Sequence, residues 1–223
     1  MSTGTLLSER APAPAAPGRF VDRGSVFAGY VGIGMAIVVV IAFALIIPVQ
    51  TLVFIAAPLC GLVIGNYANT RSGRWRPMRR VFANAAWAGF VTGLSIALMY
   101  LAIRLLFVFA DTGQMPDGSV VSSGTTADGL PVACTPGPDC TFRRYLTDPT
   151  LAELGQDLVS QGITDGDSFA RAFVGQLLQG GAWIVILTVG GAVVAGGVRS
   201  VRTVPPEAVL TGIVPLPGRT PRG

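Results

Sequence analysis

The chain contains no histidine and no lysine, so its sixteen basic residues are all arginine. Histidine is the commonest metal ligand in proteins and the usual general base near neutral pH. The nucleophile motif Gly-x-Ser-x-Gly and the phosphate-binding motif Gly-x-x-x-x-Gly-Lys are also absent. We therefore expect no catalytic residue, no metal site and no cofactor. An enzyme would have to take its acid and base from the carboxylates of one acidic segment.

Charged residues are scarce as well. They make up 13% of the chain, whereas a soluble domain normally carries about 25%. Hydrophobic residues make up 51%, the mean hydropathy is +0.59, and the apolar residues occur in long blocks. This pattern predicts an integral membrane protein. The net charge of +4 does not indicate nucleic-acid binding, because the charges are segregated by segment.

Four apolar blocks predict an all-α membrane protein built as a four-helix transmembrane bundle. A helix needs about 20 apolar residues to cross a bilayer core. Only Pro48–Thr51 separates the first two blocks, which predicts a helical hairpin over residues 25–67 with Pro58 inside its second helix. The predicted blocks are Val26–Ile47, Leu52–Asn66, Val81–Ala110 and Phe173–Val198.

The third block, residues 81–110, is longer than a bilayer core requires. As one helix it would measure about 45 Å, against a hydrocarbon thickness of about 30 Å. Asn84 and Arg104 would lie about 30 Å apart on the same helical rise. We therefore expect the hydrocarbon between these two residues, with Leu105–Ala110 projecting beyond it.

A basic loop over residues 68–80 predicts the orientation in the membrane. It carries five arginines and no acid: Arg71, Arg74, Arg76, Arg79 and Arg80. Basic residues are retained on the cytoplasmic side of a membrane. Four crossings then place both termini in the cytoplasm, and the predicted location is the cell membrane. The Pro-rich tails, residues 1–24 and 199–223, are predicted to be disordered.

The same orientation places residues 111–172 outside the cytoplasm, as a loop domain of about 60 residues between the third and fourth helices. Nine acids and two arginines lie between Asp111 and Asp167. Ser119–Ser122 and Leu130–Ala133 could form a β-ribbon. Asp148 can cap a helix that starts at Pro149 and ends at Gly162. Asp165–Ser168 is predicted to cap the fourth transmembrane helix, because the remaining ligands of a calcium loop are missing.

Two of the three cysteines, Cys134 and Cys140, fall in this external segment, and Cys60 falls in the second apolar block. A pair of cysteines in an oxidising compartment favours a disulfide. Free thiols and a metal site are the alternatives. The metal site is disfavoured because no histidine accompanies the two thiols.

Small residues recur four apart in the apolar blocks, and the longest series is Ala85, Gly89, Gly93 and Ala97. A series of this kind lies on one face of a helix and lets two backbones approach closely in lipid. It predicts either internal packing of the bundle or contact with another copy or another membrane protein.

Arg104 is the only charge well inside an apolar block. Gln176 and Gln179 of the fourth block are expected at a similar depth, and Asp111 lies two turns further along the third. Arg104 could therefore form a polar cluster with one of the glutamines, or pair with Asp111. The alternative is that it extends to the lipid head groups.

The expected function is that of a structural or accessory subunit, which acts through helix packing and its external loop. The alternative is a component of a small transporter or channel. The expected partners are the lipid bilayer and either another membrane protein or a second copy of the chain. A nucleic-acid partner is not expected.

Overall fold

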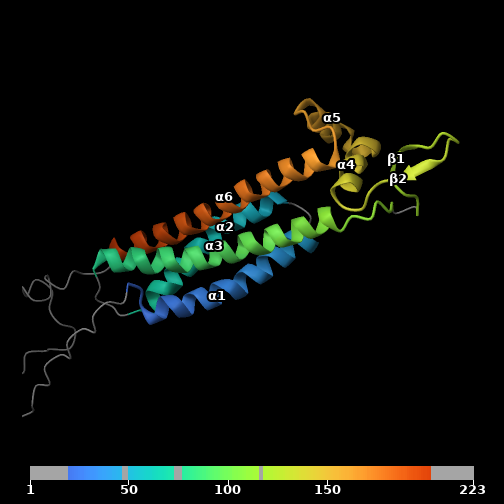
Figure 1. The fold of residues 1–223 in the computed structure, drawn as a ribbon. Helices are drawn as coiled ribbons and strands as arrows, with labels where there is room; N and C mark the ends of the chain where they lie inside the picture. The colour runs from blue at the N-terminus through green and yellow to red at the C-terminus, as the bar shows by residue number, and fades with distance from the viewer. Residues whose placement is uncertain (1–19, 47–49, 73–76, 116–117, 202–223) are drawn as a thin grey trace, which may run out of the picture.

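The computed structural model describes residues 20–46, 50–72, 77–115 and 118–201. The described chain is mostly helical, and four of its helices are long and apolar enough to cross a membrane. They are α1 (Arg23–Val40), extended by the π-helical turn η1 (Ile41–Ile46), α2 (Gln50–Thr70), α3 (Met78–Phe109) and α6 (Gly166–Val201). The four predicted apolar helices are therefore present, and Figure 1 shows them side by side in an elongated bundle.

All four long helices start before their apolar blocks, α1 by three residues, at Arg23. The helix α3 starts at Met78 and takes in Arg79 and Arg80 of the predicted basic loop. The helix α2 ends at Thr70 and continues through Pro58 without interruption. The largest difference is at α6, which starts at Gly166, seven residues before the predicted block. Arg74, Arg76 and most of both predicted tails lie outside the described residues.

The helix α6 lies along α2 and α3, while α1 packs against α3 and α2 from another side. The series of small residues on α3 faces α6 throughout. A Cβ atom added to Gly89 would lie 2.6 Å from the Cβ of Ala192, and one added to Gly93 would lie 3.0 Å from the Cβ of Thr188. At the ends of the series, Ala85 contacts Gly196 and Ala97 contacts Gly181. This series therefore packs inside the bundle.

The contact between α2 and α6 is closer still. A Cβ atom on Gly61 would overlap the carbonyl oxygen of Thr188, and one on Gly65 would lie 2.5 Å from the carbonyl oxygen of Ala192. From the other side, a Cβ atom on Gly191 would overlap the carbonyl oxygen of Pro58. Backbone therefore packs directly on backbone, and no side chain fits between α2 and α6 at these positions.

Thr92 and Thr188 are fully buried polar residues at these helix contacts. The hydroxyl of Thr92 donates to the carbonyl of Ala88 at 2.9 Å, and that of Thr188 donates to the carbonyl of Ile184 at 2.7 Å. Each buried hydroxyl is thus satisfied within its own helix.

Asn84, in the second turn of α3, joins this helix to the start of α1. It is fully buried, its amide donates to the carboxylate of Asp22 at 2.8 Å, and its side-chain oxygen accepts from the Asp22 backbone at 3.0 Å. The hydroxyl of Ser25 donates to the Asn84 carbonyl at 2.7 Å. These three hydrogen bonds fix the start of α1 on the start of α3.

Residues 110–165 connect α3 to α6, and we call them the loop module. It holds a two-stranded antiparallel ribbon of β1 (Ser122–Thr125) and β2 (Pro131–Ala133), followed by α4 (Pro138–Thr147), the 3-10 turn η2 (Pro149–Leu151) and α5 (Ala152–Ser160). It lies at one end of the bundle (Figure 1). The first strand lies further along the chain than predicted, and α4 was not predicted at all.

The two caps expected from the sequence are present in the loop module. Asp148 accepts a hydrogen bond from the Thr150 amide at 2.8 Å at the start of η2. Asp165 accepts one from the Ser168 amide at 2.6 Å at the start of α6.

Substitution of Gly61 by alanine tests the close packing of α2 on α6. Because the added methyl group would overlap the backbone of Thr188, the helices must separate, and we expect a loss of about 1–3 kcal/mol in stability. Gly34→Ala is the matched control, since a Cβ atom there meets nothing within 4 Å. Thermal unfolding in detergent, followed by circular dichroism, measures both variants. Equal melting temperatures for the two variants would contradict the packing described here.

Candidate functional site

The first two turns of α6 form the core of the loop module. Phe169 is buried, and its ring centroid lies 5.9 Å from that of Phe142 in α4 and 5.8 Å from that of Phe173. Tyr145 contacts Phe169 at 6.0 Å, and Val108 near the end of α3 belongs to the same cluster. The module is therefore built on the projecting end of α6, which explains why this helix starts before its apolar block.

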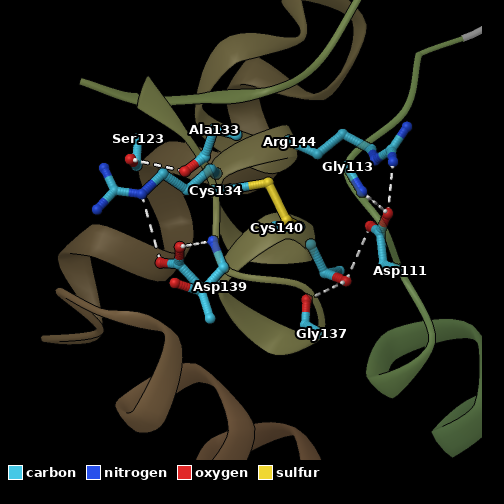
Figure 2. The surroundings of a disulfide bond; sticks show 12 residues. Asp111, Gly113, Ser123, Ala133, Cys134, Gly137, Asp139, Cys140 and Arg144 are labelled. Carbon is cyan, nitrogen blue, oxygen red and sulfur yellow. Dashed lines mark hydrogen bonds and ion pairs between the residues drawn. A yellow bond between two sulfur atoms is a disulfide. The ribbon is translucent and has the colours of Figure 1, made fainter. Parts of the chain in front are cut away.

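A disulfide joins Cys134, at the end of the ribbon, to Cys140 in the first turn of α4. This is the pair expected from the sequence, and Cys60 remains a buried thiol in α2. Figure 2 shows the bond between the two cysteines. Both are buried, and they pack against Val121 and Met115. Gly113 packs against the bond with a φ of +73°, and a Cβ atom there would lie 2.9 Å from the sulfur of Cys140. Glycine is required at this position for both reasons.

Asp111, near the start of the loop module, fixes the chain that leaves α3 on α4. Its Oδ1 accepts from Arg144 at 2.7 Å and from the Gly113 amide at 2.8 Å, and its Oδ2 accepts from Thr141 at 3.1 Å (Figure 2). Burial opposes ionisation of this carboxyl, but the hydrogen bonds from Arg144, Gly113 and Thr141 outweigh it, so the pKa of Asp111 lies below its ordinary value. Arg144 also donates to the carbonyl of Gln114 at 3.3 Å.

The sequence suggested Asp111 as one possible partner of Arg104, whereas the structure pairs Asp111 with Arg144. Arg144 was missed because the two residues are 33 positions apart in the sequence. The sequence did hold a signal for α4, the helix that carries Arg144. Gly137, with a φ of +105°, precedes Pro138 at the first helical position and Asp139 in the first turn. Proline and an acid at these positions are typical of a helix start.

Arg104 lies in the wall of a cavity of about 450 Å³ between the bundle and α5. Its guanidinium carbon lies 5.6 Å from the ring centroid of Phe173. Gln176 lines the same cavity, so the structure brings it near Arg104. Gln179 is exposed and is not among the lining residues, so the structure does not bring it into this group.

The remaining lining residues combine aromatic rings with polar groups. Phe54 comes from α2, Tyr100 from α3, Tyr145 from α4 and Asp157 from α5, and Gln161 follows α5. Such an arrangement can bind a molecule that has both an apolar and a charged part. Within the part of the chain that the structure describes, no group of three or more cysteine, aspartate or glutamate side chains could hold a metal ion.

Comparisons of this chain with protein-family models, with curated proteins and with solved structures give no significant match.

The hydrogen bonds of Asp111 predict a pH-dependent contribution to stability. Because its pKa is lowered in the folded state, the contribution is present above the ordinary carboxyl pKa of about 3.9 and is lost as the pH falls through the lower, folded value. At neutral pH we expect Asp111→Asn to lower the stability by about 1–3 kcal/mol.

Thermal unfolding of the wild type and of Asp111→Asn between pH 7 and pH 3 measures this contribution. The difference between their melting temperatures should be constant above about pH 5 and should shrink below about pH 4. Asp128→Asn, at an exposed turn position, is the control and should behave as the wild type does throughout. A difference that is equally large at pH 3 and at pH 7 would rule out the ionised Asp111 as its source.

Proposed function

We propose that this chain is an integral protein of the cell membrane that crosses the bilayer four times. Both termini would be cytoplasmic, and the loop module would lie outside. The arginines of the α2–α3 connection and the acidic loop module at the opposite end of the bundle support this orientation. The disulfide between Cys134 and Cys140 also supports it, because disulfides persist in oxidising compartments.

We further propose that the protein acts as a structural or accessory subunit, through helix packing and presentation of the loop module, and not as an enzyme. The observation that carries this proposal is the backbone contact of α6 with α2 and α3. A helix whose neighbours leave no room for a methyl group, as at Gly61 and Gly65, is poorly suited to open a path beside it. Packing of this kind favours a rigid support for the module.

A transporter or channel component is the alternative. It would need polar groups that face a common path through the bundle. Thr92, which lies against Gly32 of α1, and Thr188, at the α3–α6 contact, are buried hydroxyls of the described helices, and each is bonded to its own helix. The arrangement therefore favours the accessory role. The bilayer and a membrane protein, either different or a second copy, are its proposed partners.

The proposed orientation predicts opposite labelling at Ser72 and Ser122. Each is replaced by cysteine in a chain that lacks the native cysteines, and intact cells are treated with a membrane-impermeant thiol reagent. Only the cysteine at position 122 should react, because position 72 would face the cytoplasm. Reaction at position 72 with protection at position 122 would invert the orientation.

The accessory role predicts a specific neighbour for the loop module. Leu130 and Leu146 are exposed on the loop module, in the ribbon and in α4. Val63 is exposed on α2, which belongs to the bundle. Photoreactive residues at positions 130 and 146 should give a cross-linked product of discrete mass in native membranes. A probe at position 63 is the control for contacts made within the lipid. Liposomes that contain the purified protein should show no more solute flux than empty liposomes.

The outcomes of this experiment separate the two functions. A cross-linked product of twice the mass of the chain would identify a second copy as the neighbour. A product of any other discrete mass would identify a different protein. Solute flux above that of empty liposomes, without a cross-linked product from either module probe, would contradict the accessory role and support the transporter.

A further inference from the structure

The cavity beside Arg104 lies where the loop module meets the bundle. Five helices contribute to its wall: Phe54 comes from α2, Arg104 from α3, Tyr145 from α4, Leu158 from α5 and Phe173 from α6. Its volume of about 450 Å³ falls within the range of small-molecule binding sites, which is about 300–1,000 Å³. The space thus exists only because the module folds back over the end of the bundle.

Most of the lining residues that α2, α3 and α6 contribute are apolar. Phe54 and Tyr100 meet edge to face, with their ring centroids 6.1 Å apart, and Leu177 and Gly180 of α6 lie in the same lining beside the polar Gln176. These residues belong to the apolar blocks of three helices. A fully hydrated ligand, such as free phosphate, would leave these walls in contact with water.

Arg104 contributes a positive charge to the lining. Its side chain is partly buried, its Nε atom is shielded from solvent, and its guanidinium group lies over the ring of Phe173. A cation–π contact of this kind holds the guanidinium plane in place. The planar guanidinium group matches the oxygens of a phosphate group, to which it can donate two parallel hydrogen bonds.

The α5 side of the cavity has the opposite charge. Asp157 and Gln161 line the cavity there, and both residues are exposed. An anionic head group without a compensating charge would be repelled by Asp157, whereas an ammonium group would be attracted by it. The cavity therefore presents a cation on α3, an acid on α5 and apolar walls toward the bundle.

We propose that this cavity binds a zwitterionic phospholipid that carries a primary ammonium group. The phosphate would pair with Arg104, the ammonium with Asp157, and the start of an acyl chain would lie against Phe54 and Tyr100. This inference rests on the proposed membrane placement, which puts Arg104 at the outer boundary of the hydrocarbon, about 30 Å along α3 from Asn84. A bound lipid of this kind would tie the loop module to the bilayer.

Native mass spectrometry of the full chain in mild detergent tests the proposal with three added ligands. Phosphatidylethanolamine, which carries the ammonium, should bind more tightly than phosphatidylglycerol, which lacks it. Inorganic phosphate alone should bind much more weakly than either lipid. Equal binding of the two lipids to the wild type would contradict the role of the ammonium. Tight binding of inorganic phosphate would contradict the lipid proposal and indicate that the ligand is a soluble phosphate compound.

Three variants identify the groups responsible. Arg104→Met should weaken binding of phosphatidylethanolamine about tenfold or more, because a charge-assisted contact is lost. Asp157→Asn should remove the preference for phosphatidylethanolamine over phosphatidylglycerol. Arg171→Met is the matched control, since Arg171 is exposed on α6 and does not line the cavity, and it should bind as the wild type does. Unchanged binding in Arg104→Met would overturn the proposal.

A photoreactive phosphatidylethanolamine gives an independent measurement on the unaltered chain, in case Arg104→Met does not fold. Cross-links should map to residues 157–180, and cross-links confined to α1 would overturn the proposal. The lipid site rests on the proposed membrane orientation, which the labelling of cysteines at positions 72 and 122 tests by itself. If the labelling is as expected but no lipid binds, only the lipid site is wrong. If the labelling is inverted, the proposed orientation is wrong.

Discussion

The close approach of α6 to α2 and α3 is the constraint on which the rest of the structure depends. Helices in a bilayer gain nothing from hydrophobic burial against one another, so in the proposed membrane setting their association would depend on close packing. Gly61, Gly65 and Gly191 bring the backbones of α2 and α6 into direct contact, and Gly89 and Gly93 of α3 leave room for Ala192 and Thr188 of α6. These glycines place α6 in contact with both neighbours along its length, and α6 in turn carries the loop module.

The length of α6 connects the bundle to the loop module. Its 36 residues span about 54 Å, which is more than the proposed crossing of a hydrocarbon core of about 30 Å would need. The first turns of α6 carry Phe169, around which the module core forms, and Phe173, whose ring contacts Arg104 of α3. The ion pair of Asp111 with Arg144 fixes the chain that leaves α3 on α4 of the module. Two helices therefore hold the module, and the cavity lies between them and α5.

Features that depend on neighbouring residues could be predicted from the sequence. The apolar blocks predicted the four long helices, and Asp148 and Asp165 were recognised as caps because a cap and its helix are adjacent. Features that depend on distant residues could not. The spacing of Arg104 and Gln179 indicated a similar depth but not the direction of each side chain around its helix. The pairing of Asp111 with Arg144, and the first strand's position, depend on how the loop module folds back on itself.

The central claim is that α6 is one helix shared by the bundle and the loop module, and residue-resolved hydrogen exchange in detergent tests it most directly. If the claim is correct, the backbone amides from Phe169 through Ile184 exchange slowly as one continuous block, because all of them lie within one helix and Phe169 is anchored in the module core. If the amides between Phe169 and Phe173 exchange at the rate of an open loop while those beyond Phe173 stay protected, the helix starts at its apolar block, and the module is not built on α6.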